Sequence, residues 1–381
     1  MIVFDRVTKT YPDGTVAVDE LSLEAPSGKI TVLVGPSGCG KTTSLRMVNR
    51  MIKPTSGTIT LDGRDTSTMK EAELRRGIGY VIQHAGLFPH RTVLDNVSTV
   101  PRLLGVDRRE SEKRSMELLE RVGLDPAFAK RYPAQLSGGQ QQRVGVARAL
   151  AADPPVMLMD EPFSAVDPVV REQLQDEFLR LQDELGKTII FVTHDIDEAI
   201  KLGDQVAVLR VGGKLAQVAE PAYLLAHPVD DFIADFVGRD RGYRALSFQP
   251  TPRLPLAQER TVAMGEAVSG LDAEWVLVVD EANHPLGWVE PRRVQGEVTT
   301  EVLHRGGTVA RASGPLRAAL DAALSSPSRR GVIVDDAGAL VGTVRAHEVL
   351  NAIEDADRPA LDDPDHPGAA TTPHASSDAS A

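Results

Sequence analysis

The chain has 381 residues, of which 42% are hydrophobic and 25% charged, and its formal net charge is −12. This length allows two or three domains with sizeable cores, and the acidic balance argues against a general nucleic-acid-binding protein. No apolar run approaches the roughly 18 residues that a membrane span needs, and the first ten residues do not resemble a signal peptide. We therefore expect a cytoplasmic protein that has no nucleic acid as a partner.

The first chemical motif is a glycine-rich loop between a predicted strand (residues 29–34) and a predicted helix (residues 41–48). Its residues fit the pattern G-x-x-x-x-G-K-[ST], which binds the phosphates of a nucleotide. Glycines let successive N–H groups point at phosphate oxygens, the lysine adds a positive charge, and the threonine hydroxyl is a ligand for Mg²⁺. The residues expected to surround the phosphates are Gly35, Pro36, Ser37, Gly38, Cys39, Gly40, Lys41, Thr42 and Thr43.

Cys39 is the single cysteine of the chain, so no internal disulfide is possible. The favoured interpretation is that a small residue fits a tight loop at this position. The alternative is that Lys41 and the start of the helix lower the pKa of the thiol and make it sensitive to alkylation.

Short β-rich runs alternate with helical stretches up to about residue 238, which predicts a mostly parallel sheet covered by helices. Between residues 87 and 150 the pattern is mainly helical, so we expect a helical insertion there. Asp107 is expected to cap a helix over residues 108–122. The predicted strands after the loop are residues 59–61, 78–82, 156–159, 188–192 and 205–209.

Two adjacent acids follow the apolar run 156–159 and indicate hydrolysis of the bound nucleotide. Asp160 is expected to hold Mg²⁺ through water molecules, and Glu161 to polarise the attacking water. The alternative for either acid is to cap a helix. Gln83 is a candidate sensor of Mg²⁺ and the γ-phosphate, and His194 a candidate donor to the γ-phosphate, although a lone histidine at a strand end is usually structural.

The C-terminal third has a different composition. Residues 239–262 carry arginine and proline with few apolar clusters and are predicted to be a linker. Residues 263–352 contain a weak internal repeat, in which strand, acidic turn, glycine and strand recur at a spacing of 55, and a helix over 316–324 precedes the second copy. The tail, residues 353–381, is rich in Pro, Ala, Asp and Ser and is predicted to be disordered.

The order of these motifs resembles the ATP-binding cassette (ABC) superfamily, and the resemblance covers residues 1–238. It implies an α/β P-loop domain with a RecA-like core, an antiparallel β subdomain and a helical subdomain at about 87–150. It also implies ATP and Mg²⁺ as cofactors, with Thr42, Gln83 and Asp160 at the metal. The motifs that carry the resemblance are Tyr11, Gly35–Thr43, Gln83, Leu136–Gln140, Asp160-Glu161, Ser164–Asp167 and His194.

The resemblance further implies that two copies of the chain act together. Tyr11 resembles the aromatic residue that stacks on adenine, although on its own it would be a half-buried strand residue. Residues 164–167 resemble the loop that crosses the dimer interface, with Val166 where leucine is usual. A helix start can bind phosphate, so an inverted second copy would place its signature loop on this copy's ATP. The signature residues are Ser137, Gly138, Gly139 and Gln140.

Three segments are similar to those of importers for quaternary amines such as glycine betaine, choline, carnitine and proline. Residues 84–93 resemble the surface that receives a helix of a membrane permease subunit. Residues 160–168 are similar to the cassettes of these importers, and residues 265–352 to a degenerate pair of cystathionine-β-synthase-type (CBS) repeats. The resemblance implies a peripheral ATPase on the cytoplasmic face of the plasma membrane, held by permease subunits and served indirectly by a solute-binding protein. An importer ATPase for a polyamine or an inorganic anion, and a non-transport cassette protein, stay open as alternatives.

The CBS-like repeats depart from the nucleotide-binding pattern G-h-h-[ST]-x-x-[DN]. The second copy has Arg345 in place of the hydroxyl residue and Glu348 in place of the final acid. We therefore assign no nucleotide to this module, and leave open whether it is a dimerisation or a regulatory module. A charge-based hypothesis is a latch between the acidic tail (residues 354–381) and basic residues of the module, which salt would screen; the alternative is a tail without a role. The basic residues are Arg292, Arg293, Arg329, Arg330 and Arg345.

Overall fold

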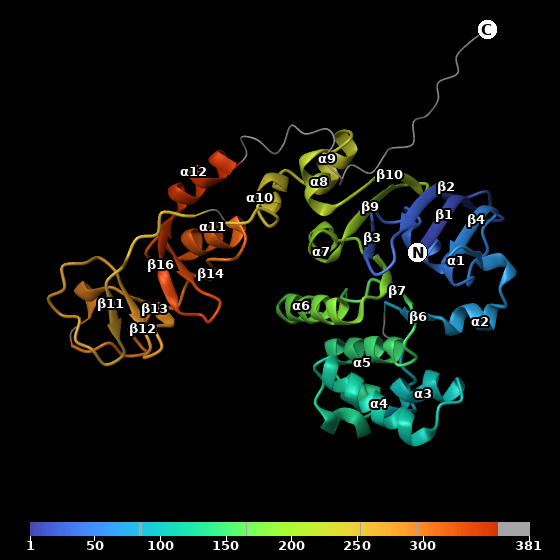
Figure 1. The fold of residues 1–381 in the computed structure, drawn as a ribbon, viewed down its shortest axis with the longest axis horizontal. Helices are drawn as coiled ribbons and strands as arrows, with labels where there is room; N and C mark the ends of the chain where they lie inside the picture. Colours follow the sequence, from blue (N-terminus) through green and yellow to red (C-terminus); the bar gives the residue numbers. More distant parts are fainter. Residues whose placement is uncertain (84–85, 165, 252, 295, 357–381) are drawn as a thin grey trace, which may run out of the picture. The chain divides into compact units, whose positions relative to one another are not determined.

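The computed structural model describes residues 1–83, 86–164, 166–251, 253–294 and 296–356. The chain divides into two compact units, of which the first ends at Phe236 and the second begins at Val237 (Figure 1). Within the described ranges, none of the helices combines the length and apolar character that crossing a bilayer requires.

The first unit contains two sheets. One is antiparallel, with the strand order β2-β1-β4-β5. Side chains from its three long strands pack into the main core of the unit, where Phe4 of β1 and Leu21 of β2 are fully buried. Its strands are β1 (Ile2–Thr10), β2 (Val16–Ala25), β4 (Ser56–Leu61) and β5 (Arg64–Asp65).

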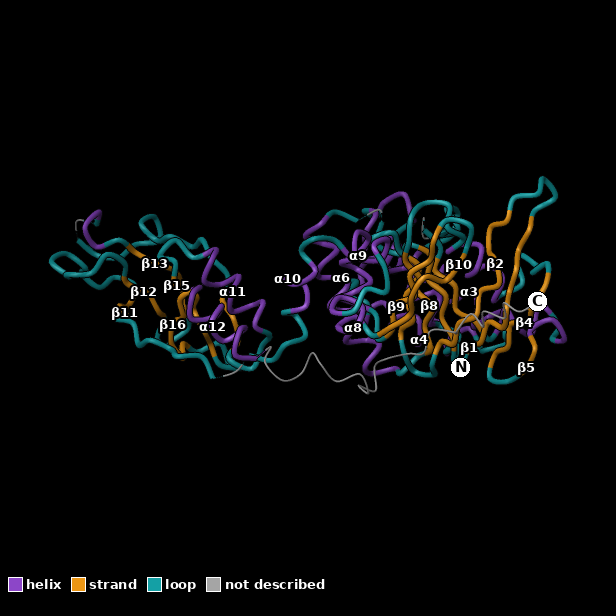
Figure 2. Tube along the Cα trace, turned by 90° about the horizontal axis from the view of Figure 1, so that it is seen from above, coloured by secondary structure: helices purple, strands orange, loops and turns teal. Residues whose placement is uncertain are grey.

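The other sheet has six strands in the order β10-β9-β3-β8-β7-β6, all parallel except β10. Every residue of β3, β7 and β8 is buried, because helices cover both faces of a parallel sheet. Figure 2 shows these strands gathered within the first unit with helices around them. The predicted α/β fold is confirmed. The strands are β3 (Ile30–Val34), β6 (Ile78–Val81), β7 (Val156–Asp160), β8 (Thr188–Val192), β9 (Gln205–Arg210) and β10 (Lys214–Ala219).

Most helices of this unit flank the six-stranded sheet, while α3, α4 and α5 gather at one end (Figure 1). Asp107 caps α4, since its side chain accepts hydrogen bonds from the N–H groups of Arg109 and Glu110 at 2.9 and 3.4 Å. The helices are α1 (Lys41–Val48), α2 (Glu71–Arg76), α3 (Val93–Leu103), α4 (Arg108–Arg121), α5 (Gly138–Leu150), α6 (Pro168–Leu185), α7 (Ile196–Leu202), α8 (Pro221–Ala226) and α9 (Asp231–Val237), with 3₁₀ turns at Thr66–Thr68, Pro126–Lys130 and Pro133–Gln135.

The second unit repeats one strand pattern twice. In each copy a parallel pair is followed by an antiparallel hairpin, and the repeated glycines occupy equivalent places: Gly287 pairs with Val278, and Gly342 with Ile333. Among the described residues, two α-helices (α11 and α12) accompany the sheet of the second copy, and the first copy has a 3₁₀ turn (Figure 2). The elements are β11 (Thr261–Ala263), β12 (Val276–Val279), β13 (Pro285–Val289), a 3₁₀ turn (Pro291–Arg293), β14 (Val309–Arg311), α11 (Leu316–Ser325), β15 (Arg330–Val334), β16 (Leu340–Arg345) and α12 (Ala346–Ala356).

The segment predicted as a linker differs from that expectation. It contains α10 (Arg241–Ala245), and its residue Leu246 is buried in the core of the second copy, with Leu254 and Leu256 packed against the same core. These apolar residues are separated by prolines and polar residues, so they form no periodic pattern in the sequence. The tail also begins later than predicted, because α12 runs to Ala356 and Ile353 packs on this core. Residues 357–381 lie outside the described ranges.

Candidate active site

The strand order brings the predicted site residues to one edge of the six-stranded sheet. In the register, Leu33 pairs with Val192 and Val192 pairs with Asp160, so β3, β8 and β7 end side by side. β6 lies next to β7 in the same direction. The carboxyl ends of parallel strands share an edge, and ligands of open α/β sheets bind there.

The phosphate loop has a backbone that only glycine tolerates at some positions. Gly38 and Gly40 have φ angles of +78° and +88°. A Cβ on Gly40 would lie 2.1 Å from the carbonyl oxygen of Ala17 in β2, and one on Gly35 would lie 2.3 Å from that of Leu209 in β9. The loop is therefore confined between two strands, and it requires glycine at these positions.

Lys41 and Thr42 begin α1 directly after this loop. The Lys41 side chain is buried, and its Nζ donates hydrogen bonds to the carbonyl oxygens of Gly35 (2.7 Å) and Pro36 (3.0 Å). The Thr42 hydroxyl donates to Asp160 Oδ1 at 2.8 Å. A hydroxyl beside a carboxylate is the oxygen donor set that suits Mg²⁺, so these two residues fit the predicted metal.

Asp160 is itself buried, and burial raises the pKa of its carboxyl group. The Thr42 hydroxyl and the Arg46 guanidinium, whose Nη2 lies 3.9 Å from Asp160 Oδ2, oppose this rise in the pKa. Burial thus makes an isolated charge at Asp160 unfavourable, and a nearby cation would favour the ionised form.

The surroundings of Cys39 argue against the alternative of a reactive thiol. Its side chain is fully buried, and burial raises the pKa of the thiol more than the nearby Lys41 lowers it. Cys39 Sγ lies 3.7 Å from Lys41 Nζ and would be 2.8 Å from a Cβ on Gly35. The cysteine therefore fills space under the loop.

The Glu161 carboxylate contacts both of the other predicted catalytic residues. Gln83 Nε2 donates to Glu161 Oε2 at 3.1 Å, and His194 Nδ1 lies 3.2 Å from the same oxygen. Glu161 has a φ of +48°, and its N–H donates to the carbonyl oxygen of Val192 at 2.9 Å. It is not a helix cap, because the cap of α6 is Asp167, which accepts from the N–H of Val170. The three side chains form one cluster.

Tyr11 lies in the turn between β1 and β2 and is half-buried. Its N–H donates to the carbonyl oxygen of Thr15 at 2.9 Å, and Lys9 Nζ lies 5.3 Å from the ring centroid. The next strand, β2, supplies the carbonyl of Ala17 that confines the phosphate loop. Tyr11 is thus a turn residue near the loop and not the strand residue of the alternative.

The signature residues form the start of α5. The Ser137 hydroxyl accepts from the N–H of Gln140 at 3.3 Å, and Gln140 Oε1 accepts from the N–H of Ser137 at 3.0 Å, which is a capping box. Ser137 and Gly138 are exposed. Within the described ranges, no hydrogen bond or ion pair joins this helix start to the phosphate loop of the same chain.

Known proteins are similar to this chain in sequence over nearly its whole length. The model of the ABC transporter family matches residues 18–164. The osmoprotectant import ATP-binding protein OsmV of Salmonella typhimurium is 44% identical over 364 residues, which cover 90% of this chain and 94% of that protein. The chain belongs to the ABC transporter family.

Other relatives of this ABC transporter chain agree. The choline transport ATP-binding protein OpuBA of Bacillus subtilis is 40% identical and covers 93% of this chain and 97% of that protein. A solved dimeric cassette, MJ0796 in a post-hydrolysis state with ADP and Pi, is 35% identical with a TM-score of 0.54, covering 58% of this chain and 99% of that one. The predicted ABC ATPase and its ATP-binding cassette are confirmed.

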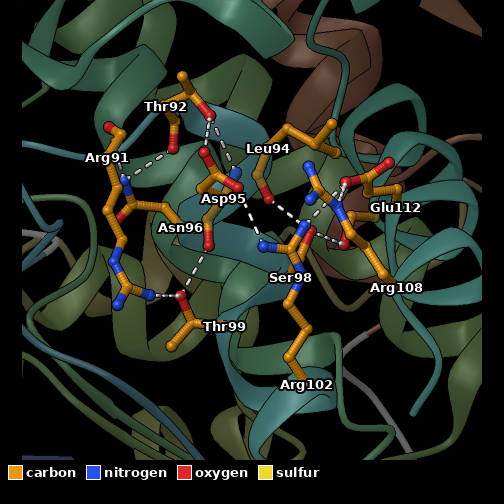
Figure 3. Close-up of polar contacts among 11 residues, drawn as sticks. Arg91, Thr92, Leu94, Asp95, Asn96, Ser98, Thr99, Arg102, Arg108 and Glu112 are labelled. Carbon is orange, nitrogen blue, oxygen red and sulfur yellow. Dashed lines mark hydrogen bonds and ion pairs between the residues drawn. The ribbon is translucent and has the colours of Figure 1, made fainter.

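A polar network holds the start of α3 in this ABC transporter ATPase (Figure 3). The fully buried Asn96 accepts from the N–H of Phe88 (2.7 Å) and donates to the carbonyl oxygens of Phe88 (3.1 Å) and Thr92 (2.9 Å). Arg102 donates to Glu112 of α4 at 2.9 Å. The loop predicted to receive a permease subunit is thus fixed to the start of α3, and α3 is itself joined to α4. Phe88 of this loop is 39% exposed, and residues 84–85 lie outside the described ranges.

Sequence reasoning missed the residues that support the site from behind. Gln142 of α5 is buried and donates to the carbonyl oxygen of Gln83 at 3.1 Å, so it ties the signature helix to the Gln83 segment. Arg46 lies one turn after Thr42 and faces Asp160. Their only sequence signal is a place within motifs already noted, because their role depends on a contact with another strand.

Proposed function

We propose that this chain is the ATP-hydrolysing subunit of an importer for quaternary-amine osmoprotectants such as glycine betaine, choline, carnitine or proline. The observation that carries the proposal is that relatives named for osmoprotectant and choline import match at least 90% of the chain, and so include the second unit as well as the cassette. The match to the solved cassette MJ0796 covers 58% of this chain. An importer for another solute, or a non-transport cassette, is the competing function.

The proposed mechanism follows from the cluster at the sheet edge. The N–H groups of the phosphate loop and Lys41 Nζ bind the β- and γ-phosphates. Thr42 and Asp160, with Gln83, would hold Mg²⁺, which neutralises charge on the phosphate oxygens when bound. Glu161 accepts a proton from the attacking water, and His194 orients that carboxylate and contacts the γ-phosphate.

We propose that two copies act together. The exposed, capped start of α5 can bind a phosphate that its own chain does not supply, and the solved cassette MJ0796 is dimeric. An isologous pair satisfies the phosphate loop and the signature loop of both copies at once, with residues 164–167 at the interface. Closure on ATP and opening after hydrolysis would then drive transport.

The same proposal places the chain against permease subunits on the cytoplasmic face of the plasma membrane, with a solute-binding protein as an indirect partner. The rigid loop around Phe88 supports this, since an exposed aromatic on a fixed frame suits a docking surface. We further propose that the second unit is a CBS-like pair that binds no nucleotide. Its residue Glu259 accepts from the Thr343 hydroxyl at 2.9 Å and pairs with Arg330 at 2.8 Å. These two hydrogen-bond donors are therefore already bonded to a carboxylate of the chain itself.

The role of Glu161 is tested by Glu161→Gln. Without the carboxylate base, phosphate release should fall at least about 100-fold, while ATP binding and an ATP-dependent closed dimer persist. Release is measured by a steady-state assay and the dimer by size-exclusion chromatography. Glu184→Gln, an exposed acid of α6, is the matched control and should retain full turnover. Substantial turnover in Glu161→Gln would exclude this assignment.

The solute class is tested by uptake of radiolabelled glycine betaine, choline and a polyamine into proteoliposomes that hold the whole complex. Betaine or choline should accumulate with internal ATP, and should not do so in complexes carrying Glu161→Gln. Uptake of the polyamine alone would mean that the proposed solute class is wrong. Purification of the chain without any membrane protein, from cells that express its natural partners, would instead favour the non-transport cassette.

A further inference from the structure

A buried carboxylate lies behind the candidate active site and has no part in the mechanism above. Glu198 of α7 is 7% exposed. Its Oε1 accepts a hydrogen bond from Gln175 Nε2 of α6 at 3.1 Å, and Gln175 is also 7% exposed. A buried carboxylate is costly unless hydrogen bonds satisfy it, so this pair has a structural or functional reason to persist.

The N–H groups of Asp197 and Glu198 donate to Asp195 Oδ1 at 2.9 and 3.4 Å, and Asp195 directly follows His194. The N–H of Asp195 donates to the hydroxyl of Thr193 at 3.0 Å. Thr193 directly precedes His194 and is 1% exposed. Hydrogen bonds thus join the turn of His194 to the first turn of α7, and the Glu198 carboxylate joins that first turn to α6.

The other side of Glu198 faces the helix that begins at the proposed dimer-interface loop. Gln175 lies on α6, which starts directly after Asp167. Arg171, one turn before Gln175, donates to the carbonyl oxygen of Val166 at 2.9 Å and attracts Glu198 electrostatically. The carboxylate thus connects α6 and its preceding loop with the turn of His194.

We propose that Glu198 is a positioning residue for ATP hydrolysis, which fixes the turn of His194 to α6 through Asp195 and Gln175. The inference rests on the proposed role of His194 beside Glu161. It makes the orientation of His194 depend on the position of α6, so that a movement of the interface loop would reach the hydrolytic cluster through hydrogen bonds. A small displacement of such a cluster lowers the rate far more than it lowers binding.

The test uses the whole transporter complex and compares kcat and KM for ATP. Glu198→Ala should lower kcat about tenfold to a hundredfold with little change in KM, because the phosphate loop is untouched. Glu198→Gln can still accept from Gln175 through its amide oxygen and should restore most of kcat. Gln182→Ala is the matched control. Gln182 is a buried glutamine of α6, the helix of Gln175, but it donates to the carbonyl oxygens of Gly28 and Lys187, away from His194.

A double-mutant comparison separates this inference from the proposed site. If Glu198 acts through His194, then Glu198→Ala should lower kcat no further in a His194→Ala background. Full kcat in His194→Ala alone would contradict the proposed role of His194. A large loss of kcat in His194→Ala together with normal kcat in Glu198→Ala would overturn the present inference. Equal losses of kcat in Glu198→Ala and Gln182→Ala, in proportion to the fall in their thermal midpoints, would overturn it as well.

Discussion

At the scale of single residues, the backbone of Glu161 is strained. A non-glycine residue at positive φ costs about 1–3 kcal/mol, and Glu161 has a φ of +48°. Its N–H donates a hydrogen bond to the carbonyl oxygen of Val192, and its own carbonyl oxygen accepts one from the Ser164 hydroxyl at 2.9 Å. These bonds hold the residue in a conformation that brings its carboxylate to Gln83 and His194. We infer that the strain is retained because it aims the proposed base.

Cys39 provides a prediction at the same scale. Because burial raises the pKa of its thiol, the folded chain holds less thiolate near pH 7.5 than an unfolded chain does, and thiolate is the reactive form. Maleimide should react with native protein more than about tenfold more slowly than with urea-unfolded protein, with or without ATP. Mass spectrometry at several pH values measures the rates. Rapid native labelling that ATP suppresses would restore the reactive-thiol alternative.

At the scale of elements, the helix starts are fixed by side chains in the sequence. Asp107, Ser137 and Asp167 each accept hydrogen bonds from N–H groups in the first turn of the helix that follows. These bonds satisfy donors that the helix itself leaves open. The start of α5 is also exposed at Ser137 and Gly138, and we propose that it contacts a phosphate held by a second copy. Capping thus sets both the local structure and the proposed contact between copies.

The cap of α4 can be tested by Asp107→Ala. Loss of the cap should cost about 1 kcal/mol, and local opening of α4 would then be about fivefold more frequent. Hydrogen exchange of the amides of Leu118 and Leu119 should accelerate by that factor. Lys113→Ala, on the exposed face of the same helix, is the control and should change exchange little. Equal acceleration in both variants would mean that the cap contributes nothing specific.

At the scale of the whole molecule, the two units have separate cores, and the second unit neutralises part of its own charge. Among the five arginines of the latch hypothesis, Arg293 pairs with Glu290 at 2.7 Å and Arg330 with Glu259 at 2.8 Å. Arg292 is exposed and 4.0 Å from Asp272. Exposed pairs contribute little and are screened by salt. The basic surface left for an acidic tail is therefore smaller than the sequence indicates.

We accordingly predict that deletion of residues 357–381 leaves the salt dependence of uptake unchanged. The deletion spares α12, so the core of the second unit keeps Ile353. Uptake into proteoliposomes is measured over a range of internal ionic strength for the full chain and the deletion. A shift in the salt concentration that activates uptake would support the latch hypothesis.

Much of the fold and of the candidate site follows from local patterns in the sequence. Apolar runs predicted the central strands, and the glycine spacing predicted the loop that Gly40 and Lys41 form. These features depend on neighbouring residues alone: a left-handed backbone needs glycine, and a doubly covered strand needs continuous apolar side chains. Motif order likewise predicted that Gln83, Glu161 and His194 share one site.

The tertiary structure decided what depends on contacts between distant segments. It determined that Leu246 and Leu256 pack on the second unit instead of forming a linker, because isolated apolar residues show no period. It determined the high pKa of Cys39, since burial outweighs a neighbouring charge. It also placed the carboxylate of Glu198 in α7 against Gln175 of α6. Sequence specifies which groups a protein has, and the fold specifies which of them meet and how much water reaches them.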